Sequence, residues 1–237
     1  MARDKPIRLQ NLPEVQIRRH AKTRRLRLKF DPTSGAFWVV AHPLTPRARI
    51  REFVEEARRF IADKSQRARP ERIAFDPGAR IPVLGIEREI APVSGIAVPR
   101  LTDTRLEIPA ETPDPRARVA TFLRALARER LDARCRAHVA ALKPRIPYRK
   151  LRIGDQRSRW GSASGRGTLS FNWRIVMAPE FVLDYLAAHE VTHLQDMDHS
   201  AKFWATCRQL APRTREAETW LNTQGKQLRL YGPDPAS

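Results

Sequence analysis

Apolar and polar residues alternate along the first forty residues of the chain. The run 26–30 alternates at period two, and the apolar run 36–40 follows a turn-forming stretch at 31–35. Such alternation is typical of strands that bury one face, and turn residues between two runs favour a hairpin. The sequence therefore predicts paired strands between Val15 and Val40, after a polar and loosely held segment at 1–13.

A helical period follows, and then a Pro-rich stretch of short strands. Apolar residues recur on one stripe from Arg47 to Gln66, after a Pro-containing break, so we expect one amphipathic helix there. The stretch 70–112 is interrupted by Pro and Gly, which favours short strands. The strand candidates are 81–86, 88–90 and 106–108.

The C-terminal half alternates between helical and strand-like periods. Helices are predicted at 115–142, 179–196, 200–210 and 214–228, and strands between 148 and 177. The Gly- and Ser-rich run 161–167 lacks the ending of a phosphate loop and is followed by a strand. We therefore interpret that run as a hairpin turn.

These elements predict an α+β protein with two parts. The Pro-containing segment 112–115 resembles a linker or a helix start. It divides the chain into an N-terminal, β-rich α+β half at 1–112 and a C-terminal domain at 113–237. In the C-terminal domain we expect a small antiparallel sheet beside a buried helix.

Composition adds a strong positive charge to this picture. The 237 residues carry a formal net charge of +19, with a pI of about 11.3, while the hydrophobic content of 41% is ordinary for a globular protein. One interpretation of the charge is sequence-independent binding of nucleic acid or nucleotides. The other, equally favoured by the sequence, is a solvated basic surface.

The cysteines and the start of the chain bear on location. Cys135 and Cys207 fall in predicted helices without a C-x-x-C neighbour, so we expect no disulfide framework and a reducing compartment. The first residues lack the apolar segment of a secretory signal, and no apolar run reaches the length of a membrane span. We therefore expect a cytoplasmic protein that does not enter a membrane.

The pentapeptide His189-Glu190-Val191-Thr192-His193 points to metal chemistry. Residues four apart stand on one face of an α-helix, so the imidazoles of residues 189 and 193 can hold one zinc ion. Glu190 then lies beside the metal, where its carboxylate can accept a proton from a metal-activated water. The preceding residues are apolar, and a buried helix seldom carries two histidines and a glutamate without partners.

A catalytic zinc site usually has a third protein ligand. His199 lies six residues after His193, just past the expected end of the helix. Glu216 and Glu218 on the last predicted helix compete with it, as in zinc proteases whose third ligand is a glutamate. The other histidines are expected to be surface or boundary residues, and they are His20, His42 and His138.

Short motifs surround the pentapeptide in a fixed order. They are Arg159-Trp160-Gly161-Ser162, the run 169–174, Ala178-Pro179, Asp184-Tyr185 and the run 199–204. In this order they resemble the YgjP-like metallopeptidase family, which is related to the SprT-like and WLM zinc proteases. A weaker similarity extends through the N-terminal half, including Val83-Leu84-Gly85. Two positions depart from the family pattern, since Ala163 replaces a usual Cys and Thr192 a usual small apolar residue.

The resemblance implies a zincin-like catalytic domain, in which the active-site helix packs against the small antiparallel sheet. It makes His189, His193 and His199 the ligands of one zinc ion per chain, and Glu190 the general base. It also implies that an extended peptide pairs with an edge strand beside that helix. Ala163 argues against an essential thiol at its position.

Candidate substrate contacts also emerge from the sequence. Asn172 lies on the strand before the zinc helix and is a candidate for contacting the substrate backbone. Tyr185 lies one turn before the first zinc ligand and faces the same way, so it is a candidate for a catalytic or a packing role. Arg159, together with Arg157 and Arg174, is expected either to flank the substrate groove or to lie on a solvated face.

Three hypotheses of function follow. The first, which we favour, is a zinc-dependent metallopeptidase acting on a protein or peptide. The second is a metal-dependent nucleoside triphosphate pyrophosphohydrolase, an activity assigned in a related family and suited to an Arg-rich groove. The third is a basic nucleic-acid-associated module with a structural metal. Glu190 argues against the third, because a purely structural site has no use for an unliganded carboxylate beside its metal.

Overall fold

The computed structural model describes residues 4–31, 35–66, 72–156 and 158–233. The chain divides into two compact units, Met1–Glu71 and Arg72–Ser237, each with its own hydrophobic core. The sequence suggested a boundary at 112/113, whereas the observed division lies at 71/72. The reason is that the short strands between 72 and 112 share one core with the long helix that follows them, so they belong to the second unit.

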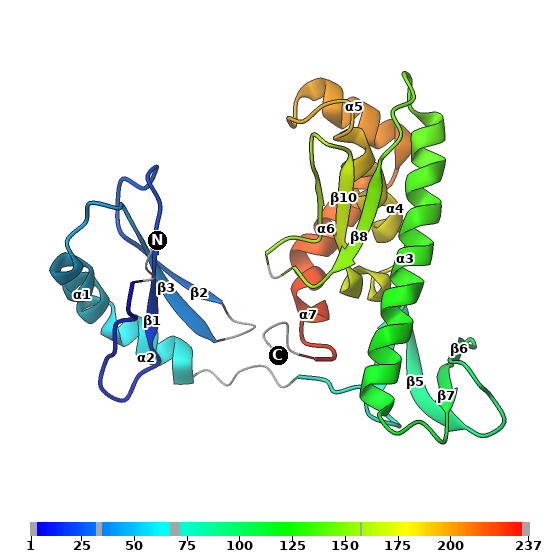
Figure 1. The fold of residues 1–237 in the computed structure, drawn as a ribbon, viewed down its shortest axis with the longest axis horizontal. Coiled ribbons are helices and arrows are strands. Elements are labelled where there is room, and N and C mark those ends of the chain that lie inside the picture. The colour runs from blue at the N-terminus through cyan, green and yellow to red at the C-terminus, as the bar shows by residue number, and fades with distance from the viewer. Residues whose placement is uncertain (1–3, 32–34, 67–71, 157, 234–237) are drawn as a thin grey trace. The chain divides into compact units, whose positions relative to one another are not determined.

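The first unit is a three-stranded sheet with two helices on one face (Figure 1). Its elements are β1 (Val15–Arg19), β2 (Arg27–Asp31), β3 (Ala36–Ala41), α1 (Arg47–Glu56) and α2 (Arg58–Gln66). The predicted hairpin is confirmed, because β2 and β3 pair antiparallel, while β1 pairs parallel with β3 on its other side. Residues 32–34 of the predicted turn lie outside the described residues.

Two expectations for this unit are wrong. The single helix expected at 47–66 is interrupted at Ala57, whose ψ of 5° is that of a turn, and the chain resumes as α2. The described part of segment 1–13 is held in place, since Ile7 and Leu9 are buried and Ile7 bridges to Val15. Their apolar side chains join the core of the first unit, which the polar composition of the segment does not reveal.

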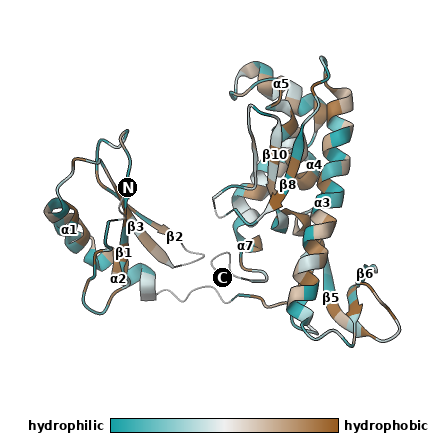
Figure 2. Cartoon of the chain, viewed as in Figure 1, coloured by the Kyte–Doolittle hydropathy of each residue, from teal (hydrophilic) through white to brown (hydrophobic). Residues whose placement is uncertain are grey.

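The second unit is built along the long helix α3 (Pro115–Ala141), which is predicted correctly to within a residue (Figure 1). Polar and apolar residues alternate around this helix (Figure 2), and its apolar face contacts both sheets of the unit and α4. The strands of the unit are β4 (Arg80–Val83), β5 (Ile86–Val93), β6 (Arg100–Leu101), β7 (Arg105–Pro109), β8 (Lys150–Gly154), β9 (Gly161–Ala163) and β10 (Thr168–Asn172).

Further helices complete this unit. They are a 3₁₀ helix (Trp173–Met177), α4 (Glu180–Thr192), α5 (Ala201–Leu210), α6 (Thr214–Trp220), a π-helical turn (Leu221–Gly225) and α7 (Lys226–Leu228). The helix predicted at 214–228 is thus divided by the π-helical turn. Among the described residues, no helix has the length and apolar character needed to cross a membrane. Cys135 and Cys207 are buried free thiols.

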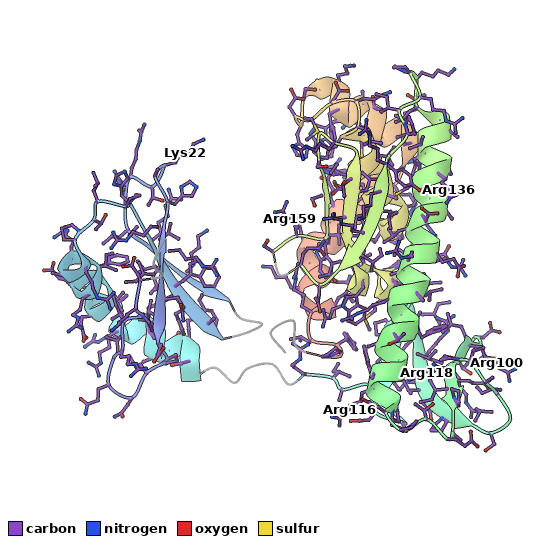
Figure 3. The ribbon with its side chains drawn as sticks, viewed as in Figure 1. Lys22, Arg100, Arg116, Arg118, Arg136 and Arg159 are labelled. Carbon is purple, nitrogen blue, oxygen red and sulfur yellow. The ribbon has the colours of Figure 1, made fainter. Side chains whose placement is uncertain are left out.

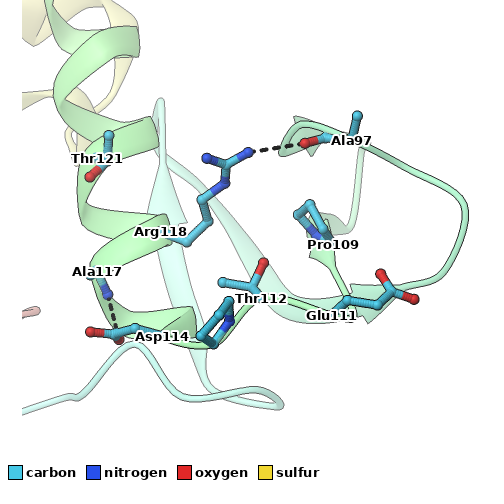
Figure 4. A pocket seen from close by; sticks show the side chains of 9 residues that line it. Ala97, Pro109, Glu111, Thr112, Asp114, Ala117, Arg118 and Thr121 are labelled. Atoms are coloured by element: carbon cyan, nitrogen blue, oxygen red, sulfur yellow. Dashed lines mark hydrogen bonds between the residues drawn. The ribbon is translucent and has the colours of Figure 1, made fainter.

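The start of α3 is fixed by local contacts that Figure 4 shows. Asp114 is the N-cap, and its side chain accepts a hydrogen bond from the backbone N–H of Ala117 at 2.9 Å, as expected of a capping aspartate. Arg118, one turn along, donates to the carbonyl oxygen of Ala97 at 3.0 Å. These contacts tie the beginning of the helix to the loop between β5 and β6.

The three sheets of the described structure share one topology. In each sheet a strand runs parallel to a central strand, and the intervening strand pairs antiparallel with that central strand at the opposite edge. The triplets are β1-β3-β2, β5-β7-β6 and β8-β10-β9. The antiparallel sheet expected beside the buried helix is therefore mixed. Periodicity cannot reveal this, because the chain crosses from β8 to the far side of β10 before the β9–β10 hairpin forms.

The β4–β5 hairpin supports the start of α4. Its turn places Leu84 and Gly85 at φ values of 54° and 78°. The backbone N–H of Leu84 donates to the carbonyl oxygen of Val176 at 2.8 Å. A Cβ atom on Gly85 would lie 2.7 Å from the Cα atom of Pro179, the residue that precedes α4. Close backbone approach at this point therefore requires glycine.

The end of the described chain is bound to the start of the second unit. Tyr231 forms a parallel bridge with Ile73. The guanidinium of Arg174, just after β10, is completely buried and donates to the carbonyl oxygens of Tyr231 and Pro233 and to the carboxylate of Asp155. A buried cation needs such partners to offset the loss of water. The segment before α4 therefore depends on the end of the chain.

Candidate metal centre

Helix α4 and the loop after it bring three imidazole rings together. The ring centroids of His189 and His193, one turn apart at the end of α4, lie 4.9 Å from each other. The His199 ring approaches them from the loop before α5, with centroids at 5.1 Å and 4.8 Å. One nitrogen from each ring lies within 4.8 Å of the other two. The expected trio is thus assembled from two separate elements.

Hydrogen bonds fix which ring nitrogens face the centre of this cluster. The Nδ1 atom of His193 lies 3.0 Å from the carbonyl oxygen of Asp196, which only accepts, so Nδ1 carries the proton and Nε2 keeps its lone pair. The Nδ1 atom of His189 lies 3.3 Å from the hydroxyl of Tyr185, which itself donates to Glu218. That hydroxyl therefore accepts a hydrogen bond from the Nδ1–H of His189. The Nε2 atom of His189 is then unprotonated. Outer contacts of this kind orient metal-binding histidines.

Aromatic side chains of α5 form a wall of the cluster. Phe203 is fully buried, and its ring centroid lies 4.6 Å from that of His193 and 5.0 Å from that of His189. Burial lowers the pKa of His189 to about 4, and the nearby His193 and His199 add to the effect. Burial also lowers the pKa of His193. Both rings are therefore neutral at neutral pH, the form that binds metal.

The geometry of the donor atoms fits a zinc ion. The Nε2 atoms of His189 and His199 lie 3.2 Å apart. Two nitrogens bound to one zinc at about 2.0–2.1 Å with a tetrahedral angle are separated by about 3.3 Å. Three imidazoles with an open fourth position are also a donor set used for catalytic zinc. The residues present can therefore hold such an ion.

The Glu190 carboxyl is buried against the edge strand β9. Its side chain is 4% exposed, and a Cβ atom on Gly161 would lie 2.4 Å from its Oε1 atom. The Oε2 atom is buried and has no hydrogen-bond partner within the described structure. Burial raises the pKa of this carboxyl to about 8, while the guanidinium of Arg159 lowers it in part. A buried acid with an unused oxygen is suited to proton transfer.

The competing ligand candidates lie outside the histidine cluster. The Glu218 carboxylate accepts the hydrogen bond of Tyr185, and the exposed Glu216 pairs with Arg213 at 2.6 Å. Tyr185 is 5% exposed and contacts His189, so its hydroxyl orients that ring instead of facing a substrate. Glu218 is thus linked to the cluster through Tyr185, whereas Glu216 pairs with Arg213 on the surface.

The other predicted substrate contacts are placed differently. Asn172 is fully buried, because its side chain caps the 3₁₀ helix by accepting from the backbone N–H of Arg174 and donates to the carbonyl oxygen of Gln156. Arg174 is also fully buried, so neither residue can line a groove. Arg159 is exposed and near enough to Glu190 to affect its pKa (Figure 3). Arg157 lies outside the described residues.

A cavity of about 600 Å³ beside His193 was not foreseen from the sequence. Arg149 and Arg166 line it, and neither has an ion-pair partner within the described residues. Its apolar lining comes from Ile146, Pro147, Leu194 and Met197. The arginines come from the segment before β8 and from the β9–β10 turn. Only the strand order brings them beside His193, so no local sequence signal marks them.

Comparison with known proteins places the chain in a family. The family model described as YgjP-like, metallopeptidase domain, matches residues 24–224. The chain belongs to the YgjP-like metallopeptidase family. The match contains the whole histidine cluster and most of both compact units. At the level of the family, this YgjP-like protein is a metal-dependent peptidase, and a metal ion and peptide substrates follow from that membership.

Other comparisons add little to the assignment of this YgjP-like chain. No curated protein matches it. A solved structure that does match is the crystal structure of the metallopeptidase zymogen of Pyrococcus abyssi abylysin, with 20% sequence identity. The match covers 42% of this chain and 95% of that chain, with a TM-score of 0.35. A TM-score this low carries no conclusion about the site.

Proposed function

We propose that the protein is a zinc-dependent metallopeptidase with His189, His193 and His199 as ligands and Glu190 as general base. The observation that carries the proposal is the convergence of three imidazoles beside a buried carboxyl that has an unused oxygen. Membership in a metallopeptidase family supports the same conclusion. A purely structural zinc site would have a protein ligand in the fourth coordination position, and Glu190 would then have no role beside the metal.

The chain's own residues supply the proton transfers. A zinc ion at the three imidazoles would supply a Lewis acid that lowers the pKa of water and polarises the scissile carbonyl. Glu190 accepts the proton of the attacking water and returns it to the leaving amine. Burial raises the pKa of this carboxyl, and an ionised carboxylate with a raised pKa is a stronger proton acceptor. Tyr185 and Asp196 keep two of the rings in the correct tautomer.

The edge strand β9 is the proposed track for the substrate. It pairs with β10 on one side, lies at the edge of its sheet and contacts α4. An extended peptide can add to such an edge through backbone hydrogen bonds. Gly161 at the start of β9 touches Glu190, so a peptide bound there would pass close to the general base.

The cavity beside His193 is the proposed specificity pocket. Arg149 and Arg166 present two unpaired guanidinium groups within it, next to apolar walls. Arginine recognises carboxylates by charge and by its paired N–H donors. We therefore expect the pocket to prefer a substrate residue with an acidic side chain, a glutamate above all because its methylenes can contact the apolar lining.

Substitution of the general base tests the proposal. Glu190→Gln keeps the size and position of the side chain but cannot accept a proton. We expect it to lower peptide hydrolysis by about 10²-fold or more, the usual range for loss of a general base, while zinc stays bound at one ion per chain. His199→Ala should instead lower the zinc content, measured by elemental analysis. Persistence of full activity in Glu190→Gln would contradict the mechanism.

The test also separates the rival activity. Casein and nucleoside triphosphates are offered to the same preparation, with release of peptides and of pyrophosphate as the two measurements. Hydrolysis of casein alone supports a peptidase. Hydrolysis of triphosphates alone, lost in Glu190→Gln, would replace it with the phosphohydrolase hypothesis. A cytoplasmic location is part of the proposal, and the buried free thiols of Cys135 and Cys207 fit a reducing compartment.

A further inference from the structure

The outer face of the sheet in the first unit carries cationic side chains around a tryptophan. The residues Phe37, Val39 and Ala41 of β3 are buried beneath the sheet, so the alternate residues of β3 face the other side. Trp38 is half-buried and is not part of the core of this unit. The face thus has an aromatic ring at its centre.

The strand register sets cations on both sides of this ring. Lys29 of β2 lies opposite Trp38, and Arg27 lies opposite Val40. On the other edge Arg18 of β1 lies opposite Val40, and its guanidinium stacks 4.4 Å from the centroid of the Trp38 ring. We call this surface the cationic sheet face, defined by Arg18, Arg27, Lys29 and Trp38.

The loop between β1 and β2 extends the charge. Lys22, Arg24 and Arg25 lie in this loop and are exposed, and Figure 3 shows Lys22 pointing away from the strands. Among the described residues, no ion pair involves these three residues or the cations of the sheet face. Like charges gathered without ion pairs repel one another, so this surface is suited to a polyanion.

We propose that the cationic sheet face binds single-stranded nucleic acid. The cations would contact successive phosphates, and a base would stack on Trp38, displacing or sandwiching the Arg18 guanidinium. Proteins that bind single strands without sequence preference combine a basic track with aromatic side chains on a sheet. A duplex hides the faces of its bases, and a membrane surface offers no planar group to stack. The ring at the centre of the charge therefore favours a single strand.

This binding does not depend on the metal centre, because every residue involved belongs to the first unit. The test uses the full-length protein and fluorescein-labelled dT20, rU20 and a 20-base-pair duplex. Fluorescence anisotropy is followed over a range of KCl concentrations. We expect both single strands to bind more tightly than the duplex, and binding of either dT20 or rU20 supports the proposal.

Two variants distinguish stacking from general charge. Neutralising the face with Arg18→Gln, Arg27→Gln and Lys29→Gln should weaken binding of dT20 and lower the slope of log K against log salt by about two. Trp38→Ala should weaken it about fivefold to hundredfold at every salt concentration and leave the slope unchanged, since it removes stacking only. All these side chains point away from the core, and circular dichroism checks that the variants fold.

The matched control removes the same charge from the helices of the same unit. It combines Arg49→Gln, Arg51→Gln and Arg59→Gln, which are exposed positions on α1 and α2. We expect this control to bind dT20 with at least about tenfold higher affinity than the face variant. Equal weakening in both would show binding by net charge alone and overturn the proposal. An unchanged affinity in Trp38→Ala, or binding to phosphatidylserine vesicles but to neither dT20 nor rU20, would also overturn it.

Discussion

The carboxyl of Glu190 lies where a side chain at residue 161 would sit. A methyl group on Gly161 would come 2.4 Å from Oε1 and 2.9 Å from Cδ of that carboxyl. Gly161 has an ordinary extended conformation that any residue could adopt. Glycine is needed here because a larger side chain would clash with Glu190. The W-G-S motif therefore has a physical role, which is to leave room for the Glu190 carboxyl, the proposed general base.

Gly161→Ala tests this contact. We expect the Glu190 carboxyl to shift, with a fall of about 10²-fold in kcat/KM and a loss of about 1–3 kcal/mol in stability from overpacking. Gly165→Ala is the control, because a Cβ atom there meets nothing within 4 Å. Steady-state peptide hydrolysis and urea unfolding measure both effects. Equal behaviour of the two variants would show that residue 161 does not hold the general base in place.

The specificity pocket gives a second prediction for single residues. In peptides that differ at one position near the scissile bond, we expect glutamate to give a kcat/KM at least about tenfold above lysine at one such position. Arg149→Glu combined with Arg166→Glu should reverse the preference, because the pocket then repels carboxylates. Mass spectrometry of a peptide library gives the ratios. Cleavage without any charge preference would remove the pocket's role but leave the proposed peptidase intact.

The sequence predicted which histidines lie together, whereas it did not predict the surroundings of the candidate substrate contacts. Helical spacing alone places His189 and His193 together, and local order adds His199. Asn172 is buried because other elements pack over its side of β10. The periodicity of the sequence does not reveal which side of a strand is packed against the core. The arginines of the specificity pocket depend on strand order in the same way, so they could not be found from local patterns.

Helix α4 is held at its beginning by the β4–β5 hairpin. Gly85 contacts Pro179, and the turn residues bond to backbone carbonyls of the segment before the helix. Two of the three proposed metal ligands, His189 and His193, lie at the other end of α4, so a displacement of its first turn moves them along with the helix. Support for the start of α4 therefore gives a physical reason why the segment Val83-Leu84-Gly85 resembles the family pattern.

Gly85→Ala should therefore destabilise the protein more than an equivalent change elsewhere. Gly78→Ala is the matched control, since Gly78 has a similar positive φ of 84° but nothing within 4 Å of its added Cβ. Both variants lose about 1–2 kcal/mol from the left-handed backbone, and Gly85→Ala loses about 1–3 kcal/mol more from the clash with Pro179. Urea unfolding gives the two free energies. A difference close to zero between the variants would contradict this role of the hairpin.

At the level of elements, the helices and hairpins were predictable and their arrangement was not. Period and turn residues predicted α3 and the β2–β3 hairpin. They also predicted the β9–β10 hairpin, but residues 161–163 of the expected turn form the strand β9, and the turn itself lies at 164–167. The parallel partners β1, β5 and β8 could not be foreseen, because pairing between distant strands leaves no local trace. The turn at Ala57 was missed for a similar reason, since the apolar stripe continues across it.

The whole molecule consists of two compact units whose boundary the sequence misplaced. Proline-rich composition at 112–115 resembles a linker, yet the strands before it complete the core around α3. Composition therefore marked a helix start and not a domain boundary. The excess of positive charge, by contrast, is evident from the composition. The structure shows that part of this charge lies on the cationic sheet face, whose cations form no ion pair among the described residues.

Buried acids give the whole molecule a stability that depends on pH. Burial raises the pKa of the Cys207 thiol from 9.0 to about 11, and burial also raises the pKa of Cys135. Burial raises the pKa of Tyr148 to about 12 as well. These groups stay protonated in the folded state, while in the unfolded chain they ionise at their ordinary pKa values. Their contribution is therefore complete below pH 9 and is lost as the pH rises above it.

We expect the free energy of unfolding to fall as the pH is raised from 9 to 11, as measured by urea titration. The thiolate fraction of Cys207 at pH 8 should be about 100-fold lower than that of a free cysteine, so its alkylation should be slower by at least that factor. Full reactivity should return in urea. Rapid alkylation of the folded protein at pH 8 would show that the thiols are accessible.

The buried guanidinium of Arg174 has a consequence for how the molecule is degraded. Two of its acceptors are carbonyls of the last described residues, and it lies six residues before the first residue of α4. An exopeptidase that removed residues as far as Tyr231 would take away two of the three acceptors of this buried cation and leave it paired with Asp155 alone. The segment that precedes α4 would then lose part of its support while His189, His193 and His199 were still present. Partly digested molecules would therefore lose activity before they lost these residues.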